Sequence, residues 1–125
     1  MGLDQYMYKL KGNITPNEYE QQLEKITQEN GLWTDESDKL IEELQNSLQF
    51  KEIAYWRKYY ELDDYMQDLY SEVSEGVFNC KYLELDADTI AHLIDLFTDE
   101  YTVNVMQQAL EYINKGYRIW YSNWW

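Results

Sequence analysis

The chain has 125 residues, with 24 acidic side chains against 10 basic ones, a formal charge of −14, and aromatic residues at 17% of its positions. This length is typical of one compact domain, so we expect residues 1–125 to form a single domain. One cysteine and one histidine exclude an intramolecular disulfide and a four-ligand structural zinc site. The acidity argues against direct nucleic-acid binding, because phosphates are held mainly by clustered lysine and arginine. The aromatic content argues against disorder.

The sequence shows no membrane-directed segment. No apolar run approaches the roughly 18 residues that a spanning helix needs, and the start Met1-Gly2-Leu3-Asp4 lacks the basic and apolar regions of a signal peptide. We therefore expect a cytoplasmic protein that does not bind a membrane.

The first elements follow from periodicity and capping. Residues 5–10 alternate, with Tyr6, Tyr8 and Leu10 on one side, which predicts a half-buried strand. Thr15-Pro16, with Glu18 three residues after the threonine, forms a capping box that predicts a helix running to about Asn30 and ending at Gly31. From Asp35 or Ser37 the pattern is helical again, with a possible break near residues 49–51.

The clearest periodic signal predicts one central helix. Its apolar positions are Tyr55, Tyr59, Leu62, Met66, Leu69 and Val73, at alternating spacings of four and three, and Ser74-Glu75-Gly76 would end it.

The last third predicts a strand, two helices and a final strand. Residues 81–85 form a short strand with Leu83 and Leu85 inward, and Asp86 caps a helix that carries Ile90, Leu93 and Phe97. The apolar positions 103, 106, 110 and 113 define another helix, stopped by Gly116, and residues 117–121 are β-prone. Together these elements predict an α+β fold dominated by helices, with a small antiparallel or mixed sheet of about three short strands packed against four to five helices.

Sequence motifs give little support for catalysis. There is no P-loop, Gly-x-Gly-x-x-Gly or His-Glu-x-x-His motif. His92 has no nucleophile in a recognisable motif around it, so a structural or solvent-exposed role is favoured, and Cys80 is expected to be a small buried residue rather than a reactive thiol. Paired acids can hold a hard cation but also cap helices. We expect no enzyme, no cofactor and no metal site.

The negative charge is concentrated in the second half. Residues 59–114 carry 13 acidic side chains, and Lys81 is the only base between Lys58 and Lys115. Such a surface can simply keep a protein soluble, or it can occupy the basic channel of a nucleic-acid-binding protein. The acids expected to bind a partner are Asp63, Asp64, Asp68, Glu72, Glu75, Asp86, Asp88, Asp95, Asp99 and Glu100.

Two aromatic segments offer alternatives. Tyr55, Trp56 and Arg57 combine rings and positive charge within one predicted helical turn, so Arg57 is either a structural anchor paired with a carboxylate or part of a small-ligand site. Trp124-Trp125 either covers the sheet or forms a protein contact.

The ends and middle of the chain resemble a family of small bacteriophage and prophage proteins, most of them uncharacterised. The matching residues are Met1-Gly2-Leu3-Asp4 with Tyr6 and Tyr8, the segment Glu52-Ile53-Ala54-Tyr55-Trp56-Arg57-Lys58, the stretch from Cys80 to Leu96, and Trp120-Tyr121-Ser122-Asn123-Trp124. After Trp-Arg-Lys, relatives tend to carry Ala-Asn followed by a histidine, where this chain has Tyr59-Tyr60-Glu61-Leu62-Asp63. The resemblance implies a phage origin, and phages encode small acidic proteins that block host defences.

Origin and charge together predict an anti-CRISPR-like inhibitor. Its partner would be a host protein in the bacterial cytoplasm, namely a nucleic-acid-binding defence nuclease such as a CRISPR effector, bound through a nucleic-acid-mimicking surface. The alternatives are a phage accessory protein that binds a small ligand near residues 55–57, and an assembly partner that uses the aromatic C-terminus.

Overall fold

The computed structural model describes residues 2–125, so Met1 of the Met1-Gly2-Leu3-Asp4 start lies outside the described residues. In chain order the elements are β1 (Asp4–Leu10), α1 (Pro16–Asn30), α2 (Asp35–Ser47), β2 (Lys51–Arg57), α3 (Tyr60–Val73), β3 (Tyr82–Leu85), α4 (Ala87–Leu96), α5 (Glu100–Asn114) and β4 (Arg118–Trp124). The described chain is therefore α+β and dominated by helices, as predicted, with four strands rather than about three.

The four strands form one antiparallel sheet in the order β2-β1-β4-β3. The N-terminal and C-terminal strands pair along their whole length at the centre, from Asp4 opposite Trp124 to Leu10 opposite Arg118. The strands β2 and β3 consequently lie at the two edges, and each has one free side.

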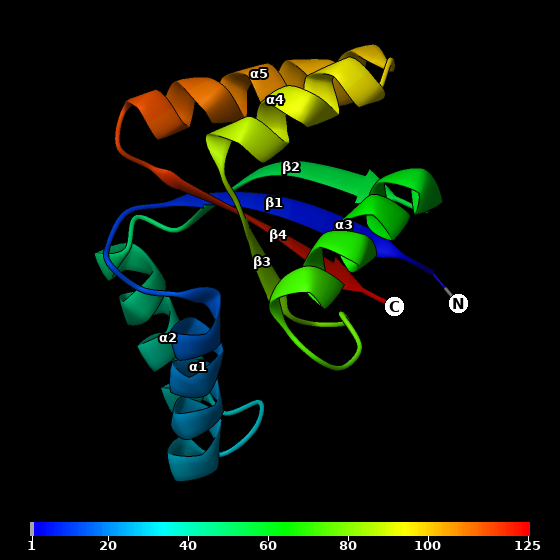
Figure 1. Cartoon of the computed structure of the whole chain (residues 1–125). Helices are drawn as coiled ribbons and strands as arrows, with labels where there is room; N and C mark the ends of the chain where they lie inside the picture. Colours follow the sequence, from blue (N-terminus) through cyan, green and yellow to red (C-terminus); the bar gives the residue numbers. More distant parts are fainter. Residues whose placement is uncertain (1) are drawn as a thin grey trace.

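Helices cover both faces of the sheet (Figure 1). On one face α3, α4 and α5 pack against Met7, Trp56 and Tyr121 in the larger of two apolar clusters. On the other face α1 and α2 form a hairpin that packs against Leu10 and Trp120. Because neighbouring residues of a strand point to opposite faces, Trp120 and Tyr121 belong to different clusters although both are fully buried.

Local signals define α1 as expected. The Thr15 hydroxyl accepts the Glu18 N–H while the Glu18 carboxylate accepts the Thr15 N–H, which completes the capping box around Pro16. The helix ends at Gly31, which has a φ of 93°, and a Cβ there would lie only 2.7 Å from Thr34 Cγ2. A glycine is therefore required at this stop.

One predicted element is wrong. Residues 51–57 form the edge strand β2, and the helix begins only at Tyr60, so Tyr55 and Trp56 are not part of a central helix. Ala54 and Trp56 point into the core while Tyr55 points out, which is a period of two. Tyr55 matches the helical spacing by coincidence, and pairing with β1 decides the conformation.

Candidate functional site

Carboxylates line the solvent side of α3. Leu62, Met66 and Tyr70 are buried against the sheet, whereas Glu61, Asp64, Asp68 and Glu72 are exposed. Spacings of three and four residues place these acids in one stripe, with about 4.5–6 Å of axial rise between neighbours. No basic side chain interrupts the stripe.

The neighbouring helix α4 extends this negative surface. The rings of Tyr65 on α3 and His92 on α4 have their centroids 6.0 Å apart, so the two helices are in contact at this point. Asp88 and Asp95 are exposed one turn before and after His92. The acids of α4 therefore flank the residue that contacts α3.

Two more acids of this surface also cap helices. Asp86 accepts the Thr89 N–H at the start of α4. Hydrogen bonding by the main chain and side chain of Thr89 holds the pKa of the Asp86 carboxyl below its usual value. Asp99 caps α5, and although burial opposes ionisation, hydrogen bonds from Thr102 and Tyr59 keep its pKa low as well. Both carboxyl groups are therefore negatively charged at neutral pH.

The surface is electronegative as a whole. Burial, followed by the charges of Glu72 and Asp86, raises the pKa of Tyr65 between the two helices. Lys81 is the only base of residues 60–114, and its Nζ lies 3.4 Å from the Tyr70 hydroxyl at the far end of α3. We call the exposed and half-buried carboxylates of this side the acidic face; they are Glu61, Asp64, Asp68, Glu72, Asp86, Asp88, Asp95, Asp99 and Glu100.

The expected partner-binding set agrees with the acidic face except at three positions. Asp63 is only 6% exposed, so its inclusion in a surface is wrong. Its Oδ1 accepts the Tyr121 hydroxyl at 2.9 Å and Asn123 Nδ2 at 2.8 Å, and Gln67 Nε2 lies 3.3 Å from Oδ2. Glu75 is exposed just beyond the end of α3. Glu61 belongs to the stripe but is absent from the expected partner-binding set, although its three-residue spacing from Asp64 indicates that both lie on one side of the helix.

The second predicted site is not assembled. Trp56 is buried, and its Nε1–H donates to the Thr102 hydroxyl at 2.9 Å, so its ring is part of the core. Tyr55 points to the opposite face of the sheet, where its hydroxyl donates to Asp4. Arg57 is exposed and forms no ion pair with residues 2–125, so the carboxylate anchor expected for it is absent.

The four other residues singled out in the sequence are placed as follows. Trp124 and Trp125 are 60% and 43% exposed, although the main chain of Trp125 is tied to the side chain of Asn79. Cys80 is exposed rather than buried, because it lies in the loop before β3 with a φ of 60°. His92 is exposed on α4.

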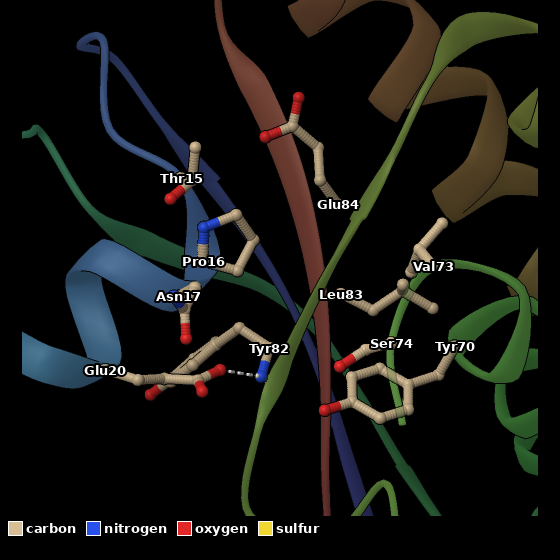
Figure 2. Close-up of a pocket in the computed structure, with 10 residues that line it drawn as sticks. All are labelled: Thr15, Pro16, Asn17, Glu20, Tyr70, Val73, Ser74, Tyr82, Leu83 and Glu84. Atoms are coloured by element: carbon tan, nitrogen blue, oxygen red, sulfur yellow. Dashed lines mark hydrogen bonds between the residues drawn. The ribbon is translucent and has the colours of Figure 1, made fainter. Parts of the chain in front are cut away.

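A groove that the sequence did not predict lies beside β3. Figure 2 shows β3 between the start of α1 and the end of α3, with Pro16 on one side and Val73 on the other. This cavity has a volume of about 500 Å³, and a second one of about 350 Å³ adjoins it and shares Val73, Leu83 and Glu84. Only the sheet order, which leaves β3 at an edge, creates this groove.

No three His, Cys, Asp or Glu side chains among residues 2–125 lie close enough together to hold a metal ion. None of the helices in that range is both long and apolar enough to span a membrane. Comparison of the chain with protein-family models, curated proteins and solved structures finds no match.

Proposed function

We propose that the protein is a phage-encoded inhibitor of a host defence nuclease, such as a CRISPR effector, and that it binds through the acidic face in place of nucleic acid. The observation that carries this proposal is the acidic face, whose nine carboxylates lie on α3, on α4 and at the start of α5, segments that carry no lysine or arginine. The resemblance of the chain ends and of residues 52–58 to phage proteins supports the phage origin.

The spacing of the charges supports mimicry of a phosphate backbone. One strand of B-DNA carries a charge about every 3.4 Å along its axis, and the α3 stripe carries one about every 4.5–6 Å. The acids of α4 raise the charge density of the face. Lysine and arginine side chains, which are long and flexible, can adapt to this difference in spacing. The mechanism is competitive, with fast association that salt weakens.

The test removes charge from the centre of the face without disturbing the core. A triple variant with Asp64→Asn, Asp68→Asn and Glu72→Gln changes three exposed helical positions. The matched control, Glu29→Gln, Glu42→Gln and Glu43→Gln, removes the same charge from exposed positions on α1 and α2. Both variants should fold like the parent chain, because none of these six side chains is buried.

The variants are compared by the plating efficiency of a phage that a CRISPR system targets. The purified proteins are then tested for competition with labelled DNA for the effector that they protect against. At roughly 0.5–1 kcal/mol per lost charge pair, the α3 variant should lose about 10- to 100-fold in affinity, whereas the control should stay within about twofold. Equal inhibition by the two variants would contradict the acidic face as the binding surface.

A second candidate function is favoured by the exposed C-terminal tryptophans. Trp124 and Trp125 together present two indole rings beside the sheet, and such rings are common anchors of protein contacts. Under this alternative, replacing both with serine abolishes partner binding, whereas neutralising the acidic face leaves it intact. One pair of variants therefore distinguishes the acidic face from the C-terminal tryptophans as the binding surface.

A further inference from the structure

The strand β3 has a free side with main-chain groups that face solvent. Its other side pairs with β4, from Tyr82 opposite Ser122 to Leu85 opposite Ile119. The Tyr82 N–H donates to Glu20 Oε2 at 2.9 Å and so points away from β4 (Figure 2). Because main-chain groups alternate along a strand, the N–H and C=O of Glu84 also face this free side.

Glu20 already occupies part of the position of a missing strand. Its carboxylate oxygen accepts the Tyr82 N–H as the carbonyl of a neighbouring strand would. No side chain of residues 2–125 caps the Glu84 N–H in the same way. The free side is therefore half protected, and its unprotected half opens into the groove beside β3.

The groove has the dimensions and walls that an extended segment needs. The two adjoining cavities lie along β3 and reach Asp86 just beyond its end, with α1 on one side and the end of α3 on the other. An additional strand would lie about 4.8 Å from β3, between the two helical layers. Val73, which is 73% exposed, offers it an apolar contact.

We propose that an extended segment of a partner protein, rich in lysine and arginine, binds along β3 as a fifth strand of the sheet. Main-chain hydrogen bonds to Glu84 would hold the segment, as in other cases of strand addition. This inference does not depend on nuclease inhibition, because the main-chain contact lies at the sheet edge, although Glu72 and Asp86 belong to both the groove and the acidic face.

Charge selects a basic segment as the occupant. The lining of the two cavities includes Glu20, Glu72, Glu84 and Asp86 and contains no lysine or arginine. Arg118 pairs with Glu84, whereas the other three acids have no lysine or arginine partner among residues 2–125. Burial raises the pKa of Glu20, so a cation bound beside it would recover part of the cost of burying its charge.

A second copy of this chain is the less favourable occupant. Each chain carries a formal charge of −14, and pairing two β3 strands would bring identical acidic walls together. Repulsion between like charges at such short range opposes this contact.

The first experiment follows the amide signals of the ¹⁵N-labelled full chain during titration with the peptide acetyl-Lys-Val-Arg-Val-Lys-amide. The expected result is a set of shifts at residues 82–85 and at the end of α3. A peptide with glutamate in place of its three basic residues should give none. Amide shifts confined to Glu61, Asp64, Asp68, Asp88 and Asp95, which lie outside the groove, or no shifts with the basic peptide, would overturn the proposal.

A pair of variants at position 84 isolates the main-chain contact. Glu84→Ala removes the carboxylate and its pairing with Arg118 but keeps the edge N–H, whereas Glu84→Pro removes the N–H as well. Proline is tolerated on an edge strand when its nitrogen faces away from the neighbouring strand. Binding of the basic peptide should be at least tenfold weaker for the proline variant than for the alanine variant.

Equal affinity of the two variants would overturn strand addition. If the proline variant does not fold, the peptide is changed instead, by methylating alternate main-chain nitrogens so that they cannot donate hydrogen bonds. Unchanged binding of the methylated peptide would again reject the proposal. Light scattering that shows a dimer of the free chain, with the amides of residues 82–85 protected by it, would assign the edge to a second copy instead.

Discussion

Two adjacent aspartates with the same charge are predicted to differ sharply in their effect on stability. Asp63 is buried on the inner side of α3, and Asp64 is exposed on its outer side. Asp63→Ala removes the acceptor of the Tyr121 hydroxyl and of Asn123 Nδ2, at 2.9 Å and 2.8 Å. Asp64→Ala removes no hydrogen bond between residues 2–125.

The size of the effect follows from the donors left behind. The Tyr121 hydroxyl is fully buried and still accepts from Gln5, but its proton has no acceptor once Asp63 is removed. Asn123 Nδ2 keeps only its bond to the Phe78 carbonyl. Each unsatisfied buried donor costs about 1–3 kcal/mol, so Asp63→Ala should lower the free energy of unfolding by roughly 2–4 kcal/mol. This is a large share of the roughly 5–15 kcal/mol that is typical of a domain.

Urea unfolding followed by tryptophan fluorescence and by circular dichroism measures the difference. The Asp64→Ala variant should stay within about 0.5 kcal/mol of the parent, as expected for an exposed helical position. If the two variants prove equally stable, the buried network around Asp63 does not contribute to folding, and the assignment of Asp63 to the core rather than to the surface loses its energetic basis.

Three further predictions concern ionisable groups at the edges of the helices. Burial raises the pKa of Glu20, so its charged form is unfavourable in the folded protein. Glu20→Gln should therefore raise the melting temperature at pH 7, because glutamine still accepts the Tyr82 N–H without a charge. This gain should vanish at a pH below the carboxyl pKa, as calorimetry at pH 4 and 7 can check. Asp99→Ala should lower the free energy of unfolding by about 1 kcal/mol, because it removes the acceptor of the Thr102 N–H at the start of α5. Asp99→Asn should keep most of that stability. Similar urea midpoints for the two variants would argue against the cap. Burial and the hydrogen bond to Asp99 raise the pKa of Tyr59 from 10.0 to about 12. The stability that this tyrosine contributes is therefore present below pH 10 and should be lost as the pH rises toward 12. Alkaline unfolding of a Tyr59→Phe variant should show a weaker pH dependence.

Local signals in the sequence were sufficient wherever a helix or strand is determined by its own residues. The capping box at Thr15, the cap at Asp86 and the stop at Gly31 are read directly from residue types, and the structure confirms all three. The inward positions of Leu83 and Leu85 follow from alternation alone and are also confirmed. These features depend on interactions within a few residues, so no knowledge of the fold is needed.

Features that depend on the sheet were beyond the reach of the sequence. β2 was predicted as helix because Tyr55 continues the spacing of α3, and only pairing with β1 makes this segment a strand. Asp63 looks like its exposed neighbour in sequence, and its burial depends on Tyr121 and Asn123, which lie about 60 residues away on β4. The groove beside β3 likewise requires the strand order. Long-range pairing is thus where the prediction failed.

The acidic face combines two roles, and this determines how its charges must be tested. Asp86 and Asp99 contribute negative charge and also accept the N–H groups that begin α4 and α5. Alanine at either position would weaken a helix as well as remove a charge, so lost binding would have two explanations. Asparagine caps a helix about as well as aspartate does, which means that Asp86→Asn changes the charge alone. Asp99→Asn keeps the cap but replaces one of the two oxygens that accept from Tyr59 and Thr102. A loss of partner binding by Asp86→Asn, with unchanged unfolding, therefore reports on electrostatic recognition and not on the shape of the helices.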